Sequence, residues 1–474
     1  MNAATTFTSP YQERTKSQFD LIVIGSGPAA KTIAREAVQS KRSVALVENR
    51  EFGGTCALRG CNPKKVFTNA ALLFDQISFD EGKRFEHQKL ELNWQELLSY
   101  KRQFTEPVAK HTEEKLNDQG VATFHGQASF VDRQTVEVHP SKNDPASVDP
   151  ARRIHAKRFA ICVGAAPRPL SFPGSGWIIN SDEFLEQTHL PRRVLFVGGG
   201  YISMEFGHVA RSYGSDVTIV EQGDRLLSGF DHDMVDQLVA WSKQKGIRFR
   251  TECKIQAIKK QSGNSFLVHF KDNQPIEVDL VVHGAGRIPN LDRLNLSAAE
   301  IKFTKRGIAV DSSLRSTSHD GVFAGGDCAN NGAPMLTPIA NEDAYVIGKN
   351  VFADQPTHRA NYRGIAAVAF TCPPIATVGM TEKEASERGI EFDIHTKDTS
   401  TWGSVRKAGL TCAGYKILVE KSSGLIVGAH LLGVGSEDQV NLFALAIRHQ
   451  IPAKELKAMP FAYPTFTADI KRMV

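Results

Sequence analysis

Two cysteines separated by four residues stand in the glycine-rich segment FGGTCALRGCNPKK. Cys56 and Cys61 fall at the start of a predicted helix, with Pro63 in its first turn, where proline is tolerated. A helix N-terminus and neighbouring lysines both favour the thiolate, which is the reactive form of cysteine. Zinc sites usually use closer pairs and need two further ligands, and the sequence has no second such pair. We therefore expect a redox-active pair, with two buried structural thiols as the alternative.

A glycine turn precedes these cysteines and follows a short apolar run, residues 20–24, that fits a buried strand. After the turn GSGPAA come a helical pattern and a second apolar run ending at Glu48. Gly25 permits the tight turn, Gly27 lets the backbone approach a pyrophosphate, and Ala30 replaces the third glycine. The helix N-terminus offers N–H groups to phosphates, and Glu48 is placed to bind an adenosine ribose.

The same order recurs at VLFVGGGYIS, residues 194–203, and its second apolar run ends at Glu221. Glu48 and Glu221 each lie 23 positions after the first glycine of their turn. One glycine turn is a weak signal, but the repetition favours two dinucleotide sites over two structural turns. Two sites imply a flavin and a nicotinamide that exchange electrons. Glu221 favours NADH, because a carboxylate repels the 2′-phosphate of NADPH, although the nearby Arg225 would soften that preference.

Length and composition narrow the protein class. A chain of 474 residues is too long for one core, so we expect two or three domains. The net charge of +5 is small, and no basic run exceeds two residues, which gives no support to nucleic acid or membrane binding. Residues 1–17 are polar and predict a flexible tail without a signal peptide. Seven cysteines, an odd number, argue against a secreted disulfide framework and favour a cytoplasmic location.

The chain resembles the pyridine nucleotide–disulfide oxidoreductases, a family that includes glutathione reductase, dihydrolipoyl dehydrogenase and mercuric reductase. GGTCALRGCNPKK is similar to the redox-disulfide signature of that family. The resemblance extends over nearly the whole chain from about residue 18. Further matching segments follow in order: ICVGAAPRP, GGGYISMEFG, GAGRIPN, GVFAGGDCA, LTPIANEDA and FTCPPIATVG.

The resemblance implies a role for each matched residue. Cys61 is the thiol nearest the flavin and receives its electrons, and Cys56 is the interchange thiol that attacks an external disulfide. Lys64 and Glu205 form an ion pair beside the flavin N5, where a fixed cation stabilises the reduced flavin. The implied FAD contacts are Gly25, Ser26, Gly27, Glu48, Thr55, Lys64, Ala128, Asp327 and Thr337. The implied contacts of the nicotinamide nucleotide are Gly198, Gly200, Ile202, Glu205, Glu221 and Gly286.

One segment departs from the family pattern. Family disulfide reductases end in a segment close to HPTxxxE, whose histidine is the acid–base that one subunit supplies to the cysteines of its partner. Here FAYPTFTADIKRMV puts Tyr463 at the histidine position and Ala468 at the glutamate position. An unperturbed tyrosine, with a pKa of about 10, donates a proton poorly at neutral pH. Rapid reduction of glutathione disulfide is therefore doubtful. Tyr463 either donates a hydrogen bond to substrate or thiolate, or only packs.

The expected fold class is α/β, with two Rossmann-like dinucleotide-binding domains and a C-terminal α/β dimerisation domain. The resemblance implies a homodimer with shared active sites. The expected boundaries are a tail at 1–17, an FAD domain at 18–165 completed by 286–350, an NAD(P) domain at 166–285 and an interface domain at 351–474.

The leading hypothesis is an FAD-dependent NAD(P)H oxidoreductase that passes hydride through flavin to the Cys56–Cys61 disulfide and on to a small disulfide-type acceptor. A second hypothesis is the reduction of a metal ion, as in mercuric reductases, or of a quinone. A third is a slow-turnover redox sensor. No resident metal is expected, and the other five cysteines are assigned no chemistry.

Overall fold

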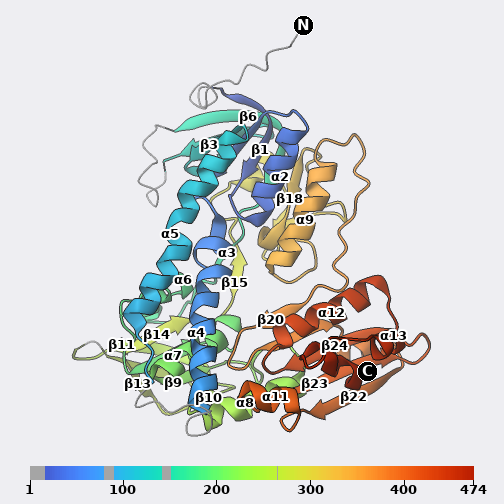
Figure 1. Cartoon of the computed structure of the whole chain (residues 1–474). Coiled ribbons are helices and arrows are strands. Elements are labelled where there is room, and N and C mark those ends of the chain that lie inside the picture. The colour runs from blue at the N-terminus through green and yellow to red at the C-terminus, as the bar shows by residue number, and fades with distance from the viewer. Residues whose placement is uncertain (1–15, 80–89, 141–150, 264) are drawn as a thin grey trace. The chain divides into compact units, whose positions relative to one another are not determined.

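The computed structural model describes residues 16–79, 90–140, 151–263 and 265–474 (Figure 1). The predicted tail, apart from its last two residues, lies outside these ranges. The described residues divide into two compact units, each built from three segments of the chain. The first unit draws on Met1–Pro63, Arg102–Arg168 and Arg287–Tyr362, and the second on Lys64–Lys101, Pro169–Gly286 and Arg363–Val474.

The first unit is built on a sheet with the strand order β3-β2-β1-β6-β5-β4, and β18 also pairs with β6. The pairings among β1, β2, β3, β6 and β18 are parallel, whereas β4 and β5 are antiparallel. The strands are β1 (Gln18–Ile24), β2 (Val44–Glu48), β3 (Val121–His125), β4 (Gln127–Phe130), β5 (Thr135–His139), β6 (Arg152–Ile161) and β18 (Val322–Ala324). All five residues of β2 are buried, as expected of a strand covered on both faces.

Two helices lie side by side in this unit, α2 (Pro28–Gln39) and α9 (Thr337–Asn350) (Figure 1). The predicted apolar face of α2 is buried through Ile33, Ala34 and Ala37. The order β1, glycine turn, α2, β2 is therefore the predicted nucleotide-binding order. It places the start of α2 at the carboxyl ends of the parallel strands, where such sheets bind ligands.

The cysteine segment corrects one expectation. Cys56 lies in a separate short helix, α3 (Gly54–Leu58), and only Cys61 begins the longer helix α4 (Cys61–Phe79). The break arises because Arg59, with φ near −140°, leaves the helical region. Gly60 then makes a turn so tight that an added Cβ would lie 3.0 Å from the carbonyl oxygen of Thr55. Helix α5 (Trp94–Asp118) follows later in the chain.

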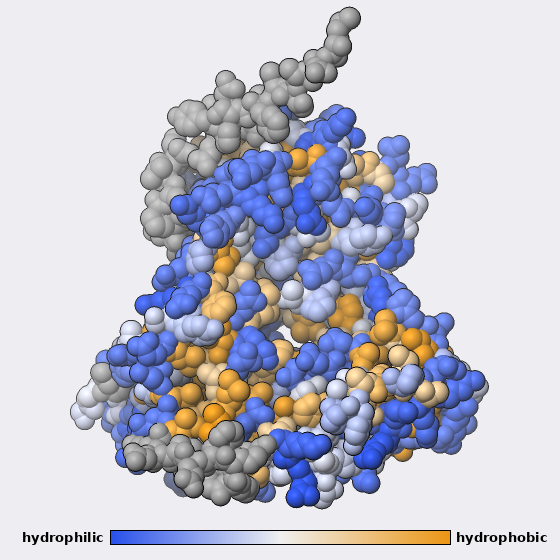
Figure 2. All heavy atoms as spheres, in the orientation of Figure 1, coloured by the Kyte–Doolittle hydropathy of each residue, from blue (hydrophilic) through white to orange (hydrophobic). Residues whose placement is uncertain are grey.

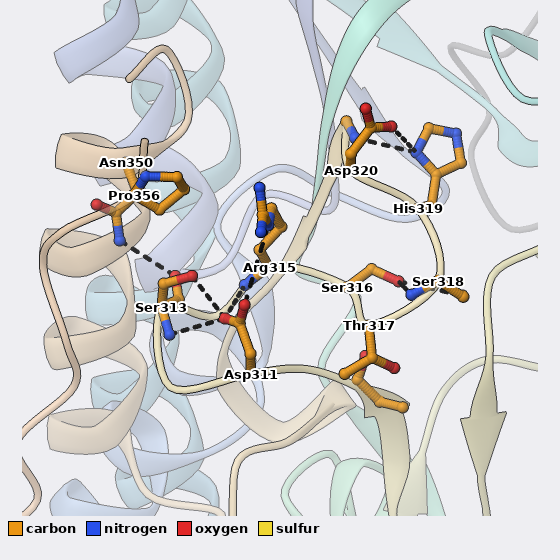
Figure 3. Close-up of polar contacts among 12 residues, drawn as sticks. Asp311, Ser313, Arg315, Ser316, Thr317, Ser318, His319, Asp320, Asn350 and Pro356 are labelled. Atoms are coloured by element: carbon orange, nitrogen blue, oxygen red, sulfur yellow. Dashed lines mark hydrogen bonds and ion pairs between the residues drawn. The ribbon is translucent and has the colours of Figure 1, made fainter. Parts of the chain in front are cut away.

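Hydrogen bonds hold the loop that leads into β18 (Figure 3). The Oδ1 atom of Asp311 accepts from the backbone N–H of Ser313 at 2.8 Å and of Arg315 at 3.2 Å. Asn350, at the end of α9, donates to the carbonyl of Ser313 at 3.2 Å. These contacts tie the loop to α9. They fix the entry to the strand that leads to Asp327.

The second unit contains the repeat of the nucleotide-binding order. Its parallel sheet has the order β10-β9-β8-β14, with α7 (Tyr201–Tyr213) between β8 and β9 and with α8 (His232–Gln244) between β9 and β10. The strands are β8 (Arg193–Val197), β9 (Asp216–Val220), β10 (Arg248–Arg250) and β14 (Leu280–His283). An antiparallel sheet adds β11 (Ile255–Lys260), β12 (Phe266–Phe270) and β13 (Ile276–Val278).

The last part of the second unit is an antiparallel sheet in the order β20-β21-β24-β23-β22. Helix α12 (Ser436–His449) packs on it and buries Val440 and Phe443. The strands are β20 (Ala367–Ala369), β21 (Ile375–Gly379), β22 (Phe392–Asp398), β23 (Gly414–Glu420) and β24 (Ile426–Leu432), and α13 (Ala453–Ala458) follows α12. The fold class is α/β, as expected.

Apolar side chains reach the surface along the second half of α4 (Figure 2). Leu73, in that half of the helix, is 59% exposed. Among the helices that the structure describes, none is both long enough and apolar enough to cross a membrane.

Candidate active site

The two cysteines of the predicted pair lie together in the first unit. Cys56 is half-buried and Cys61 is exposed. The Thr337 hydroxyl, in the first residue of α9, donates to the Cys56 sulfur at 3.3 Å and lies 3.5 Å from the Cys61 sulfur. One hydroxyl thus contacts both thiols, although it comes from a helix far away in the sequence.

The surroundings of Cys56 raise the pKa of its thiol. The hydrogen bond of Cys56 to Cys61 raises the pKa of Cys56 far above its ordinary value, and burial raises it further. The hydrogen bond from Thr337 and the positive charge of Lys31 both lower the pKa of Cys56. The roles of the two thiols in the exchange stay a prediction.

The start of α3 is hydrogen-bonded to the first glycine turn. The backbone N–H of Gly53 donates to the Ser26 hydroxyl at 2.9 Å, and that hydroxyl donates to Glu48 at 2.6 Å. Gly54 approaches Gly27 so closely that an added Cβ would lie 2.5 Å from the Gly27 Cα. The structure therefore brings together the predicted residues Ser26, Gly27 and Glu48, and it anchors the helix of Cys56 to them.

The turn before α2 leaves room for a bound group. Gly25 has φ +102°, and an added Cβ would lie 2.4 Å from the carbonyl oxygen of Cys162, so glycine is required there. At Gly27, by contrast, no atom of the described residues lies within 4 Å of an added Cβ. Open space at a helix N-terminus fits the pyrophosphate of a dinucleotide. The second oxygen of Glu48 accepts from the backbone N–H groups of Asn49 and Arg50 at 2.8 and 3.0 Å.

A cavity of about 340 Å³ in the first unit is lined by Asp327. Burial raises the pKa of the Asp327 carboxyl, and the guanidinium of Arg287 acts in the opposite direction. The mixed charge of the lining, which includes Arg168, Lys305 and Arg306, suits a ligand with hydroxyl and phosphate groups. Together with the open face at Gly27, it fits the FAD that the sequence predicts.

Two other predicted FAD contacts are less informative. Thr55 is exposed on α3. Ala128, in β4, is 2% exposed in the apolar core, so only its backbone could contact a nucleotide.

In the second unit, Lys64 and Glu205 form an ion pair with an Nζ–Oε1 distance of 2.6 Å. Glu205 is 1% exposed, and the same oxygen accepts the backbone N–H of Phe370 at 2.8 Å. The Lys64 ammonium also lies 5.0 Å from the centre of the Phe370 ring. The cation is therefore held from two sides. Its role beside a flavin stays a prediction.

The second glycine turn has the same structural features as the first. Gly198 has φ +95°, and an added Cβ would lie 2.5 Å from the carbonyl oxygen of Gly284. The carboxylate of Glu221 accepts the backbone N–H of Gly199 at 2.6 Å through one oxygen and that of Gly223 at 2.7 Å through the other. Gly200 caps α7, and an added Cβ there would lie 3.8 Å from the carbonyl oxygen of Gly284. These groups fit the adenosine half of a nicotinamide nucleotide.

Other residues predicted for this turn differ in what they contact. Arg225 pairs with Asp236 at 2.9 Å, so its charge is already engaged. Ile202 is partly buried and packs against the core of the second unit. Gly286 has φ +97°, which permits the turn between β14 and β15 (Arg287–Pro289).

Tyr463 is 85% exposed in the single chain, so it does not pack within that chain. Asp469, near the position of the family glutamate, hydrogen-bonds the hydroxyl of Ser404.

Sequence reasoning missed Phe370, because it contributes a backbone N–H, which no residue type reveals.

The comparisons with known proteins agree with this geometry. Residues 19–344 match the family model of the pyridine nucleotide-disulphide oxidoreductases, and residues 365–474 match that of their dimerisation domain. The chain is 29% identical to dihydrolipoyl dehydrogenase of Staphylococcus aureus over 94% of each chain. It is 27% identical to mercuric reductase of Staphylococcus aureus over 96% of this chain and 81% of that one. It is 29% identical to trypanothione reductase of Leishmania donovani over 96% and 95%.

Among solved structures, the HOCl-induced flavoprotein disulfide reductase RclA from Escherichia coli superposes with a TM-score of 0.85. The match covers 96% of this chain and 99% of that one at 24% identity, which shows a shared fold. A Cu(II) complex of its C43S mutant gives a TM-score of 0.86. The chain therefore belongs to the pyridine nucleotide-disulphide oxidoreductase family, whose members are flavoprotein oxidoreductases that use FAD and NAD(P)H.

Proposed function

We propose that this chain uses FAD, a nicotinamide nucleotide and the Cys56–Cys61 pair to reduce a small disulfide-type acceptor other than glutathione disulfide. The observation that carries the proposal is the contact of both thiols with the Thr337 hydroxyl. Exchange needs two sulfurs close enough to form a disulfide, one of them accessible to an acceptor. Cys56, the sulfur that we propose attacks the acceptor, is half-buried, and Cys61 is exposed. When bound, FAD supplies the two-electron link between the nicotinamide and the disulfide.

The nicotinamide nucleotide that we propose is NADH. Two backbone N–H groups hold the Glu221 carboxylate, so it cannot easily turn away from a 2′-phosphate. Arg225, the cation that would offset the repulsion, is paired with Asp236. A carboxylate fixed at this position favours the 2′-hydroxyl of NADH.

We also propose a homodimer with shared active sites. The match to the family dimerisation domain supports it. So do the exposed Tyr463 and Met459 near the C-terminus, which are 85% and 50% exposed in the single chain. With tyrosine in the histidine position, the proposed acceptor is one whose leaving thiolate needs little help from a general acid. We also propose a cytoplasmic location, because seven cysteines, an odd number, argue against a secreted disulfide framework.

The test is an anaerobic titration of the purified yellow protein with NADH and NADPH in parallel, followed by its visible spectrum. The expected result is a long-wavelength thiolate–flavin band after the first equivalent, and its absence in Cys61→Ser. Turnover with small disulfides is expected to disappear in the double variant Cys56→Ser, Cys61→Ser. Cys412→Ala, which changes a buried cysteine outside the pair, is the matched control. Turnover that survives in the double variant would contradict the proposal and favour quinone reduction.

A second candidate function is the reduction of a soft metal ion. Two adjacent accessible thiols are suitable ligands for such an ion. A relative named mercuric reductase and the Cu(II) complex of RclA support this candidate. Metal-dependent oxidation of NADH that requires both cysteines, with no turnover of small disulfides, would favour it. Slow turnover with every acceptor would favour a redox sensor.

A further inference from the structure

A second cavity, of about 510 Å³, lies within the second unit and is separate from the residues of the proposed electron path. Its lining includes Gln187, His189, Lys260, Phe266, Asp279 and Leu280. Sites for small molecules usually have volumes of about 300–1,000 Å³, an apolar wall and a few polar groups that orient the ligand. Phe266 and Leu280 provide the apolar wall of this cavity, and the other four residues provide the polar groups.

The cavity lies at the end of the parallel sheet that is opposite to the second glycine turn. Leu280 is the first residue of β14, and it pairs in register with Val194 near the start of β8. Gly198, which opens the glycine turn, comes directly after the last residue of β8. Sheets of this type bind nucleotides at the carboxyl ends of their strands. A ligand in the cavity is therefore a different molecule from the nicotinamide nucleotide.

Lys260 and Phe266 lie on the same face of the antiparallel sheet. They are register partners in β11 and β12, and directly opposite residues of an antiparallel pair point to the same side. The Phe266 ring centre lies 6.1 Å from that of Trp177, and the Lys260 ammonium lies 5.0 Å from the centre of the same Trp177 ring. Trp177, in the turn Ser175–Trp177, therefore contacts both the cation and the aromatic wall of the cavity.

The charges around the cavity favour an anionic ligand. Within the described ranges Lys260 forms no ion pair, and its ammonium lies over the Trp177 ring. The Asp279 carboxylate is already engaged, because it accepts the backbone N–H of Arg193 at 2.9 Å and its guanidinium at 2.5 Å. Arg193 also pairs with Glu277, but Glu277 lies one residue before Val278 in β13 and points to the other face of the sheet. Lys260 is thus the charge that the lining offers to a ligand.

We propose that this cavity binds a small aromatic carboxylate, with its carboxylate on the Lys260 ammonium and its ring against Phe266. An ammonium binds a carboxylate through charge-assisted hydrogen bonds, and aromatic rings pair in offset or edge-to-face arrangements. Gln187 and His189 are the polar groups that orient the ligand between these two contacts. The site uses neither the cysteine pair nor FAD, so it does not depend on the proposed function.

Two other ways of occupying the cavity predict different measurements. A neutral apolar molecule would bind through Phe266 and Leu280 alone, so its affinity would not depend on the charge of Lys260. An aromatic anion that binds at the nucleotide turn instead would compete with the nicotinamide nucleotide. A carboxylate held by Lys260 at the opposite end of the sheet depends on that charge and does not compete.

The experiment is a calorimetric titration of the intact flavoprotein with 1-naphthoate, and with 1-naphthamide as the neutral probe of the same shape. Each titration is repeated with NAD⁺ present at saturation. The variants are Lys260→Met, which removes the cation, and Lys260→Arg, which keeps it. Lys259→Met is the matched control, because Lys259 is the neighbouring residue of β11 and points to the opposite face of the sheet. Thermal unfolding shows whether each variant is folded.

We expect the Kd for 1-naphthoate to rise about tenfold in Lys260→Met, because the carboxylate then lacks its charged hydrogen-bond donor. Lys260→Arg and Lys259→Met are expected to keep the wild-type Kd, and NAD⁺ is expected to leave it unchanged. The wild type should bind 1-naphthamide about tenfold more weakly than 1-naphthoate. Equal affinity of the wild type for the two probes, displacement by NAD⁺ or no binding of 1-naphthoate would overturn the inference, and none of these results depends on a variant that folds.

Discussion

Lys64 and Glu205 are joined by an ion pair of 2.6 Å, and the Glu205 oxygen that receives the ammonium also accepts the backbone N–H of Phe370. The carboxylate is almost fully buried, whereas the Lys64 side chain is 18% exposed. The anion of the pair therefore lies in the core, whereas its cation is partly exposed.

We expect Glu205→Gln to keep the contact with Phe370 but to leave Lys64 without its counter-charge. Removal of one partner of a buried pair costs about 3–5 kcal/mol, and the partial exposure of Lys64 reduces this to about 2 kcal/mol. Flavin reduction by NADH should slow at least about tenfold, because the cation is no longer held in place. Urea unfolding and stopped-flow absorbance measure the two effects. Glu387→Gln, in an exposed pair with Lys383, is the control and should change stability by less than about 0.5 kcal/mol.

The contact between Gly54 and Gly27 predicts a severe effect of one added methyl group. Gly54 has φ +74°, and its added Cβ would lie 2.5 Å from the Gly27 Cα. Gly54→Ala should displace α3 from the glycine turn, reduce bound flavin and destabilise the protein by about 2 kcal/mol or more. Gly403→Ala, at a site where no atom of the described residues lies within 4 Å of an added Cβ, should be neutral or slightly stabilising. Equal flavin content and equal unfolding midpoints in both variants would contradict this account.

Local patterns were sufficient to predict much of the fold. Buried apolar runs and glycine turns predicted β1, α2 and β2 and their repeat at β8, α7 and β9, because each signal lies within a few tens of residues. The break between Cys56 and Cys61 was not predicted, because it depends on the backbone of Arg59.

The long-range contacts of the candidate site could not be predicted from local sequence patterns. Thr337 entered the prediction only through the family resemblance, since its approach to Cys56 depends on how α9 returns to the first unit. Phe370 contributes through its backbone N–H, which cannot be recognised from the residue type.

The fixed carboxylate of Glu221 predicts the nucleotide preference. In Glu221→Ser the repulsion of a 2′-phosphate disappears, although a hydroxyl remains near the ribose. We expect the KM for NADPH to fall about tenfold and the KM for NADH to rise, which steady-state kinetics with each nucleotide measures. Asp236→Asn, which frees Arg225 from its partner, should lower the KM for NADPH by a smaller factor. A wild-type enzyme that already prefers NADPH would contradict our interpretation of Glu221.

His208 predicts a pH dependence of stability. Its Nδ1 atom lies 2.9 Å from the backbone N–H of Cys372 and must accept it, and its Nε2 atom lies 3.0 Å from the Ser242 hydroxyl. That hydroxyl donates to the carbonyl of Leu238, so it accepts from Nε2. The imidazole is therefore held neutral. Burial, assisted by the charge of Lys245, lowers the pKa of His208 from 6.5 to about 3.

Because the folded pKa of His208 lies below the unfolded value, its contribution to stability is complete above pH 6.5 and is lost as the pH falls toward about 3. At pH 5 the expected loss is about 2 kcal/mol relative to pH 7. His208→Gln can preserve part of the hydrogen bonding without a titrating group, so its free energy of unfolding should fall less between pH 7 and pH 5. Urea unfolding at the two pH values measures the difference, and His449→Gln at the end of α12 controls for the loss of a histidine as such. Identical pH slopes for the wild type and His208→Gln would mean that the imidazole already takes up a proton in the folded state.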